Sequence, residues 1–121
     1  MSESVIGQVD GVTLDCPDPK VLADFYQRAT GWPTVYDTGE YIYLSGPGTF
    51  QLGFQRVADQ VPPSWPPTER QAHLAFSVAD LDAGERRLLD LGATKPEPQP
   101  NEAFFRVLLD PAGHPFYVYV R

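Results

Sequence analysis

The chain has 121 residues, the length of one domain. Hydrophobic residues make up 42% of it and aromatic residues 12%, which suits a packed core and excludes a disordered chain. Sixteen acidic against nine basic residues give a net charge of −7, so we expect neither nucleic acid nor an anionic membrane as a partner, because both are bound through Lys and Arg. A cationic or neutral small molecule and a protein remain open as partners.

Cysteine content and the N-terminal sequence restrict the cellular setting. Cys16 is the single cysteine, which excludes an intrachain disulfide and a zinc site of several cysteines. The first residues lack the basic and apolar regions of a signal peptide, and no stretch approaches the ~18 apolar residues of a transmembrane helix. We therefore expect a reduced, cytoplasmic protein.

The first half of the chain predicts a strand, a helix and three further strands. Residues 8–16 alternate between apolar and polar side chains, as in a strand with one buried face. Asp18 and Pro19 are typical of a helix start, apolar residues then recur at helical spacing, and Gly31 is placed to end the helix. Short strands are expected near 34–38, 40–45 and 49–55.

A proline-rich segment near the middle separates two similar halves. Four prolines surround Trp65 within residues 62–67, which forbids a helix or a central strand there. We interpret residues 56–71 as a linker, with Trp65 packing against it rather than forming a lid.

The second half repeats the order of the first. Residues 73–78 alternate like a strand, Asp80 is placed to begin a helix and Gly92 to end it, and 96–100 predicts a poor edge strand. A hairpin follows, with strands at 104–109 and 115–120 joined by a turn at 110–113.

The residues expected to begin and end the helices lie at a nearly constant offset between the two halves. Asp80 follows Asp18 by 62 positions, and Gly92 follows Gly31 by 61. Such an offset indicates a duplicated unit. We predict an α+β fold in a single domain, 1–121, built from two tandem βαβββ modules at about 7–55 and 72–121.

Three stretches, in this order, carry a resemblance to a known superfamily. They are residues 12–19 with Phe25 and Tyr26 downstream, residues 73–82 with 91–94, and residues 109–116. They resemble the vicinal oxygen chelate superfamily, which includes glyoxalases and bleomycin-resistance proteins, and residues 65–66 and 71–74 are similar to glyoxalase-like proteins common in actinobacteria. The resemblance implies a curved mixed sheet around a cleft between the modules, and a homodimer.

The resemblance also implies positions for a divalent metal. Mapping the family's ligand positions by register gives Gly11, Gln51, His73 and Tyr117. Only His73 and Gln51 could coordinate a metal, because glycine has no side chain and a tyrosine with a pKa near 10 is a poor donor. Asp15 lies on the same strand face as Gly11 and is the candidate to replace the ligand missing there, but it would have to do so from ~13 Å away along the strand. We expect no metal cofactor, with a divalent metal on His73 and Gln51 as the open alternative.

Strand alternation selects the ligand-binding candidates. They lie opposite the large apolar residues of their strands, and they are Thr13, Asp15, Tyr43, Gln51, Gln55, His73, Tyr117 and Tyr119. The tyrosines suit stacking on a flat ligand or a cation–π contact. His73 is the catalytic candidate, as a general base without metal, and the alternative is a partly buried histidine with one hydrogen bond.

Arg106 is the further ligand-binding candidate. The alternation around it is ambiguous: facing the cleft it would suit a carboxylate or phosphate, and facing outward it is a surface charge. His114 is interpreted as a turn residue, and Cys16 as a small buried apolar side chain.

Two functions follow from these residues. The first is metal-independent binding or sequestration of a small molecule in the cleft, as in bleomycin-resistance proteins. The second is an enzyme of the same superfamily, a lyase, isomerase or dioxygenase centred on His73. One scaffold hosts both kinds of protein, so the fold alone does not choose between them. The sequence has no Ser-His-Asp set, Walker loop or GxGxxG motif to support other chemistry.

Overall fold

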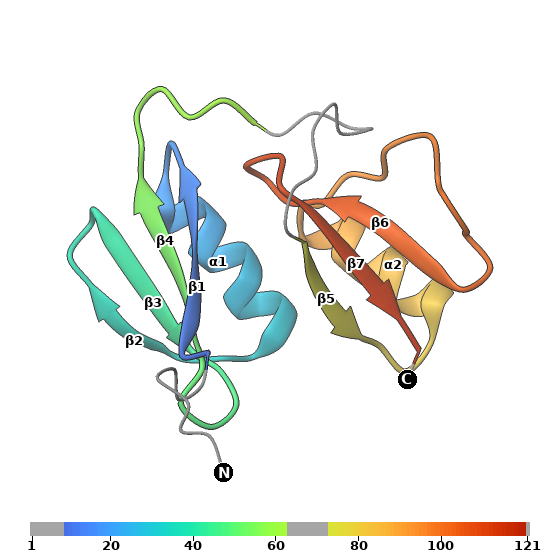
Figure 1. The fold of residues 1–121 in the computed structure, drawn as a ribbon, viewed down its shortest axis with the longest axis horizontal. Helices are drawn as coiled ribbons and strands as arrows, with labels where there is room; N and C mark the ends of the chain where they lie inside the picture. The colour runs from blue at the N-terminus through green and yellow to red at the C-terminus, as the bar shows by residue number, and fades with distance from the viewer. Residues whose placement is uncertain (1–8, 63–72, 121) are drawn as a thin grey trace, which may run out of the picture.

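The computed structural model describes residues 9–62 and 73–120 and has a mixed α+β architecture, as the sequence predicts (Figure 1). Most of the predicted linker, and Trp65 with it, lies outside the described residues. The elements in chain order are β1 (Gly11–Cys16), α1 (Pro19–Thr30), β2 (Thr34–Asp37), β3 (Tyr41–Ser45), β4 (Gln51–Arg56), β5 (Leu74–Ser77), α2 (Leu81–Leu91), β6 (Phe105–Leu109) and β7 (Pro115–Tyr119). Neither described helix is long and apolar enough to cross a bilayer.

Both helices begin and end at the residues that the sequence indicates. The Asp18 carboxylate accepts a hydrogen bond from the Lys20 amide at 3.1 Å, and Asp80 accepts one from the Ala83 amide at 2.8 Å. These bonds satisfy amides of the first turn, which have no partner within the helix. Gly31 ends α1 with φ 79° and Gly92 ends α2 with φ 121°, conformations that favour glycine.

Each module builds its own small sheet. Sheet A has the order β1-β4-β3-β2, with β1 parallel to β4, and sheet B has the order β5-β7-β6, with β5 parallel to β7. In both sheets the first strand therefore pairs with the last strand of its module and lies at a sheet edge. This shared topology agrees with the duplication seen in the sequence.

The second module differs from the first at the edge of sheet B. The poor edge strand predicted at 96–100 is absent; Thr94 forms a single bridge with Leu109, and the Gln99 side chain bonds both the N–H and the C=O of Val107, at 3.0 and 2.9 Å. Prolines at 96, 98 and 100 explain the difference, because they lack the N–H that a strand ladder needs. A side-chain amide thus takes the place of a strand's backbone.

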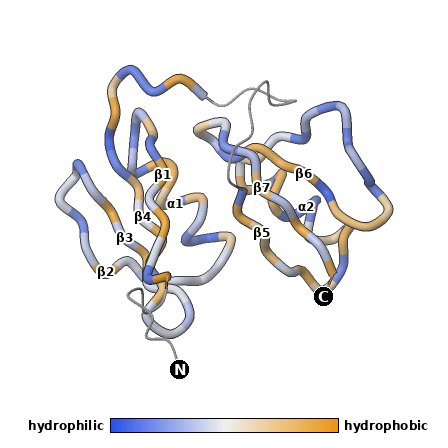
Figure 2. The backbone as a smooth tube through the Cα atoms, viewed as in Figure 1, coloured by the Kyte–Doolittle hydropathy of each residue, from blue (hydrophilic) through white to orange (hydrophobic). Residues whose placement is uncertain are grey.

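The two modules share one hydrophobic core. Apolar side chains of β1 and β5 belong to the same cluster as those of the helices, and Figure 2 colours the backbone by the hydropathy of each residue. The rings of Phe25 and Tyr26 on α1 both lie 6.1 Å from the ring of Phe116 on β7, and Tyr26 stacks on Phe54 of β4 at 5.6 Å. Helix α1 therefore packs against both sheets.

A buried polar contact also joins the modules. The Tyr26 hydroxyl donates to Asp110 Oδ2 at 2.7 Å, and Asp110 Oδ1 accepts the amides of Ala112 and His114. Burial raises the pKa of Asp110, and the hydrogen bond from Tyr26 and those from the turn oppose that rise. His114 lies in the turn as expected, and its Nε2 also lies 2.7 Å from the Asp15 carbonyl of the first module.

Candidate functional site

All five candidate ligand residues of the first half gather on the outer face of sheet A. This is the face opposite the core, and it carries Thr13, Asp15, Tyr43, Gln51 and Gln55. The strand register brings them together: Gly11 lies beside Gln51, and Asp15 beside Gln55. Alternation along the strands was sufficient to select this set, because successive side chains of a strand point to opposite faces.

Tyrosines line an open hollow on this outer face. The hollow has a volume of about 530 Å³ and is lined by Val35, Tyr36, Tyr41, Tyr43 and Gln51. The rings of Tyr36 and Tyr43 lie 5.7 Å apart. Sequence reasoning missed Tyr36, because the pairing of β2 with β3 shifts register between Thr34 and Tyr36 and so breaks the alternation.

Gly53 is a second residue that sequence reasoning missed. A Cβ atom at this position would lie 2.6 Å from Cδ1 of the Tyr43 ring and 3.1 Å from the Thr13 hydroxyl. The absence of a side chain therefore lets the Tyr43 ring lie across strand β4. A glycine within a strand is the signal that could have found it.

The outer face of sheet B carries a stack of three rings. His73, just before β5, is exposed, and its ring stacks on Tyr117 at 4.8 Å and 19°. Tyr117 stacks in turn on Phe105 of β6 at 5.1 Å and 23°. The structure thus joins two predicted residues, His73 and Tyr117, and adds Phe105, whose face the sequence left ambiguous. Tyr119 pairs with Phe105 in register and lines a different hollow, between the modules.

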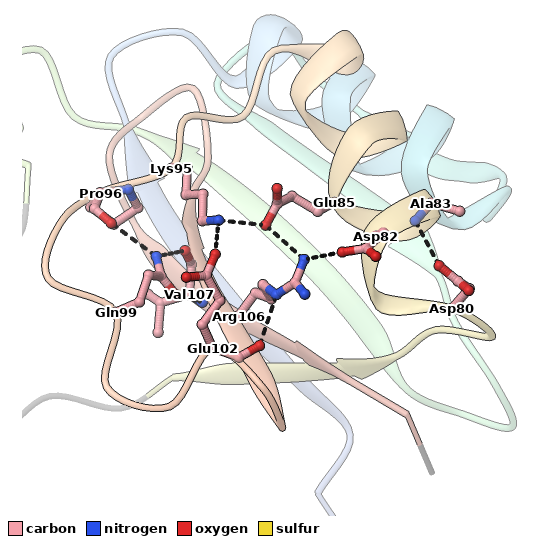
Figure 3. Close-up of polar contacts among 10 residues, drawn as sticks. All are labelled: Asp80, Asp82, Ala83, Glu85, Lys95, Pro96, Gln99, Glu102, Arg106 and Val107. Atoms are coloured by element: carbon pink, nitrogen blue, oxygen red, sulfur yellow. Dashed lines mark hydrogen bonds and ion pairs between the residues drawn. The ribbon is translucent and has the colours of Figure 1, made fainter.

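The sequence left the face of Arg106 open, and the structure places this residue on the helix side of sheet B. Its register partner Val118 lies in the core, so Arg106 shares the helix-facing side of sheet B. There its guanidinium pairs with Asp82 at 2.9 Å and Glu85 at 3.2 Å of α2, and its Nε donates to the Glu102 carbonyl (Figure 3). Lys95 joins Glu85 and Glu102 to the same network. Arg106 is therefore not grouped with the other ligand candidates.

The two outer faces do not face each other within one chain. Both sheets direct their inner faces into the shared core, with α1 between sheet A and the second module (Figure 1). The outer face of sheet A and the three-ring stack of sheet B consequently point away from that core. The cleft expected between the modules of one chain is not formed by these residues.

Within one chain, the mapped metal positions do not come together around a divalent metal. A Cβ atom at Gly11 would lie 2.5 Å from the Gln51 carbonyl oxygen, so the backbone leaves no space for a ligating side chain there. His73 and Gln51 belong to outer faces that point apart. Within residues 9–62 and 73–120, no cluster of three or more His, Cys, Asp or Glu side chains is arranged to hold a metal.

Comparisons with solved structures show the same fold in several proteins. A glyoxalase-related enzyme from Fulvimarina pelagi is 23% identical with a TM-score of 0.70, covering 96% of this chain and 89% of that one. A glyoxalase/bleomycin resistance protein from Albidiferax ferrireducens is 19% identical with a TM-score of 0.66, at 93% and 97% coverage. The fosfomycin resistance protein FosX from Listeria monocytogenes, complexed with Mn(II) and a dihydroxypropylphosphonic acid, is 16% identical with a TM-score of 0.75, at 97% and 94% coverage.

Sequence comparisons identify the family. No curated protein matches the sequence. The family model of the glyoxalase-like domain matches residues 11–119. The resemblance to the vicinal oxygen chelate superfamily is thereby confirmed, whereas the likeness to actinobacterial proteins stays a prediction. Since the match spans most of its length, the chain belongs to the glyoxalase-like domain family.

Proposed function

We propose that the protein binds a small, flat, neutral or cationic molecule without a metal, and that two copies together form the complete site. The observation that carries the proposal is the pair of exposed aromatic surfaces, the tyrosine-lined hollow of sheet A and the His73–Tyr117–Phe105 stack of sheet B. Aromatic rings on an exposed sheet face are available to stack on a planar ligand or to contact a cation.

The charge of the chain supports a neutral or cationic ligand. The net charge is −7, and Asp15 lies exposed on the outer face of sheet A. An anionic ligand would approach this face against repulsion, whereas a cation would be attracted. The polar amides of Gln51 and Gln55 on the same face would orient such a ligand through hydrogen bonds.

A second copy of the chain would complete the site. Each chain carries two aromatic surfaces that point apart, so each surface is open on one side. Strands β1 and β5 each pair with a single neighbour among the described residues, which leaves an edge for association. A two-fold dimer would set the sheet A of one copy against the sheet B of the other and form two equivalent sites.

Titration with a dye tests the binding proposal. We expect ethidium, a flat aromatic cation, to bind more tightly than neutral phenanthridine, and Tyr43→Ala to weaken ethidium binding by about tenfold. Gly53→Ala should weaken it too, because the new methyl group displaces the Tyr43 ring. Phe104→Ala, which removes an exposed ring outside both surfaces, is the matched control. Equal affinity of Tyr43→Ala and Phe104→Ala for ethidium would contradict the proposal.

Mixing two variants with weakened binding tests the shared site. Tyr43→Ala and Tyr117→Ala each damage a different half. In a mixed dimer, one site receives both intact halves, so random mixing should restore roughly a quarter of the wild-type binding capacity. Sedimentation velocity reports the dimer itself. Failure of the mixture to regain any capacity, with both variants dimeric, would place the site within one chain.

The enzyme alternative has a specific observation in its favour, namely the Mn(II) complex of the similar FosX fold. Elemental analysis of protein purified without chelator separates the two functions. The binding proposal expects no stoichiometric metal. Near-stoichiometric manganese, iron, nickel or zinc that disappears in His73→Ala would overturn it in favour of an enzyme.

A further inference from the structure

A second hollow lies between the modules, on the helix-facing side of sheet B. It has a volume of about 630 Å³ and is enclosed by the C-terminal half of α1, residues Trp32 and Phe50, strand β5 and helix α2. We call it the junction pocket. Because the three-ring stack lies on the opposite face of sheet B, the junction pocket is separate from the site proposed above.

Three aromatic rings from three segments form one wall of the junction pocket. Trp32 packs edge-on to Phe50 with ring centroids 6.2 Å apart, and lies 6.5 Å from Phe76. Gly46 makes this arrangement possible, since a Cβ atom there would lie 3.0 Å from Phe50 and 3.3 Å from Trp32. All three rings are only half-buried, although apolar rings of this size could be buried completely in the core. Half-buried rings gathered around a hollow of this volume are typical of a small-molecule site.

Arg87 contributes a positive charge to the same pocket. It lies on α2, lines the pocket and is exposed. The neighbouring cations Lys95 and Arg106 are held by Glu85, Asp82 and Glu102 on the other side of the module. Arg87 makes no ion pair with any residue in 9–62 or 73–120, in a chain where acidic residues outnumber basic ones. Its guanidinium is free to pair with an anion from outside.

We propose that the junction pocket binds a small aromatic carboxylate. The ring of the ligand would lie against Trp32, Phe50 and Phe76, and its carboxylate would pair with Arg87. A guanidinium matches a carboxylate with two parallel N–H donors, so the pocket combines an apolar slot with a specific polar end. Strand β5, which has one edge without a strand partner among the described residues, borders the same pocket. Occupation of the pocket by a second copy of the chain is the competing outcome.

Matched probes separate charge recognition from apolar binding. The probes are 2-naphthoate and its neutral analogue 2-naphthamide. Their binding is measured by calorimetry and by the change in the NMR signal of the Trp32 indole N–H. Naphthoate should bind more tightly than naphthamide and shift the Trp32 signal. Arg87→Gln should weaken naphthoate binding by roughly fivefold and leave naphthamide unchanged. Arg86→Gln, the adjacent exposed arginine that does not line the pocket, is the control.

A filling variant and a dilution series complete the test. Ala29→Trp places a ring into the pocket from α1 and should abolish naphthoate binding, while ethidium binding on the outer faces is retained. Three results would overturn the proposal: no naphthoate binding at millimolar concentration, equal loss in Arg87→Gln and Arg86→Gln, or a Trp32 signal that shifts with protein concentration and not with naphthoate. The last result would assign the pocket to a second copy of the chain.

Discussion

Cys16 shows how one buried side chain links stability to pH. Its side chain is 0% exposed, and its thiol donates to the Gln55 carbonyl at 3.7 Å. Burial raises the pKa of the thiol from 9.0 to about 11, and the nearby charge of Asp110 adds to the rise. The folded chain therefore keeps the thiol proton at a pH where the unfolded chain has lost it, so the free energy of unfolding falls as the pH rises through 9 towards 11.

We expect Cys16→Ala to remove this part of the loss of stability at alkaline pH. Between pH 8.5 and 11 the wild type should lose up to roughly 2 kcal/mol more stability than the variant, since each unit of pKa shift is worth about 1.4 kcal/mol. Urea unfolding at a series of pH values measures the difference. Tyr26, whose pKa burial also raises, is present in both proteins and cancels in the comparison. Parallel stability curves for the two proteins would contradict the prediction.

At the scale of single residues, alternation along the strands places some side chains and fails for others. Gln51, Tyr43 and His73 were predictable, because regular strands assign every second side chain to one face. Tyr36 was not, since a register shift in β2 interrupts the alternation. Phe105 was not either, because Phe104 beside it is equally apolar and yet 72% exposed.

The segment 95–102 and helix α2 are joined by an ionic network that can be tested at the scale of elements. Arg106 contacts Asp82 and Glu85 of α2 and the Glu102 carbonyl, and its side chain is 13% exposed. Arg28 forms a single pair with Asp24 at 3.8 Å, and both side chains are 58% exposed. The several charged hydrogen bonds of Arg106, which is only partly exposed, should contribute more to the free energy of unfolding than the one solvated ion pair of Arg28.

We expect Arg106→Ala to lower the free energy of unfolding by about 1–3 kcal/mol, and Arg28→Ala by less than about 0.5 kcal/mol. Part of the Arg106 effect should disappear in 1 M salt, which screens the contribution of the charges. Urea unfolding at low and high salt measures both effects. Ethidium binding should be retained in Arg106→Ala, because the side chain lies on the helix side. Equal losses in the two variants would show that the network adds nothing beyond a surface pair.

Local signals account for the elements better than for their pairing. Asp18, Gly31, Asp80 and Gly92 mark helix ends through hydrogen bonds and backbone conformations that depend on a few adjacent residues. The prediction of an edge strand at 96–100 was wrong, because the structure of this segment depends on a partner distant in the sequence. Gln99 supplies the hydrogen bonds to Val107 that the three prolines cannot.

At the scale of the whole molecule, the shared core predicts that the two modules unfold together. Phe116 of β7 is 1% exposed and contacts Phe25 and Tyr26 of α1. We expect Phe116→Ala to lower the free energy of unfolding by about 3–5 kcal/mol, as for other buried phenylalanines. Hydrogen exchange should accelerate in both sheets, since the lost contacts belong to both modules. Phe104→Ala serves as the exposed control, and protection retained in sheet A alone would indicate independent modules.

By itself, the sequence determined the α+β class, the duplication, the ends of both helices and the side chains on the outer face of sheet A. These features depend on local periodicity and on residues close to one another in the chain. Only the tertiary structure decided that the inner faces of both sheets pack into one core, that the outer faces point apart, and that Arg106 turns towards α2. The physical reason is that the packing of one sheet against the other depends on the shapes of side chains about 90 residues apart, such as Tyr26 and Phe116, and no local pattern records how they fit.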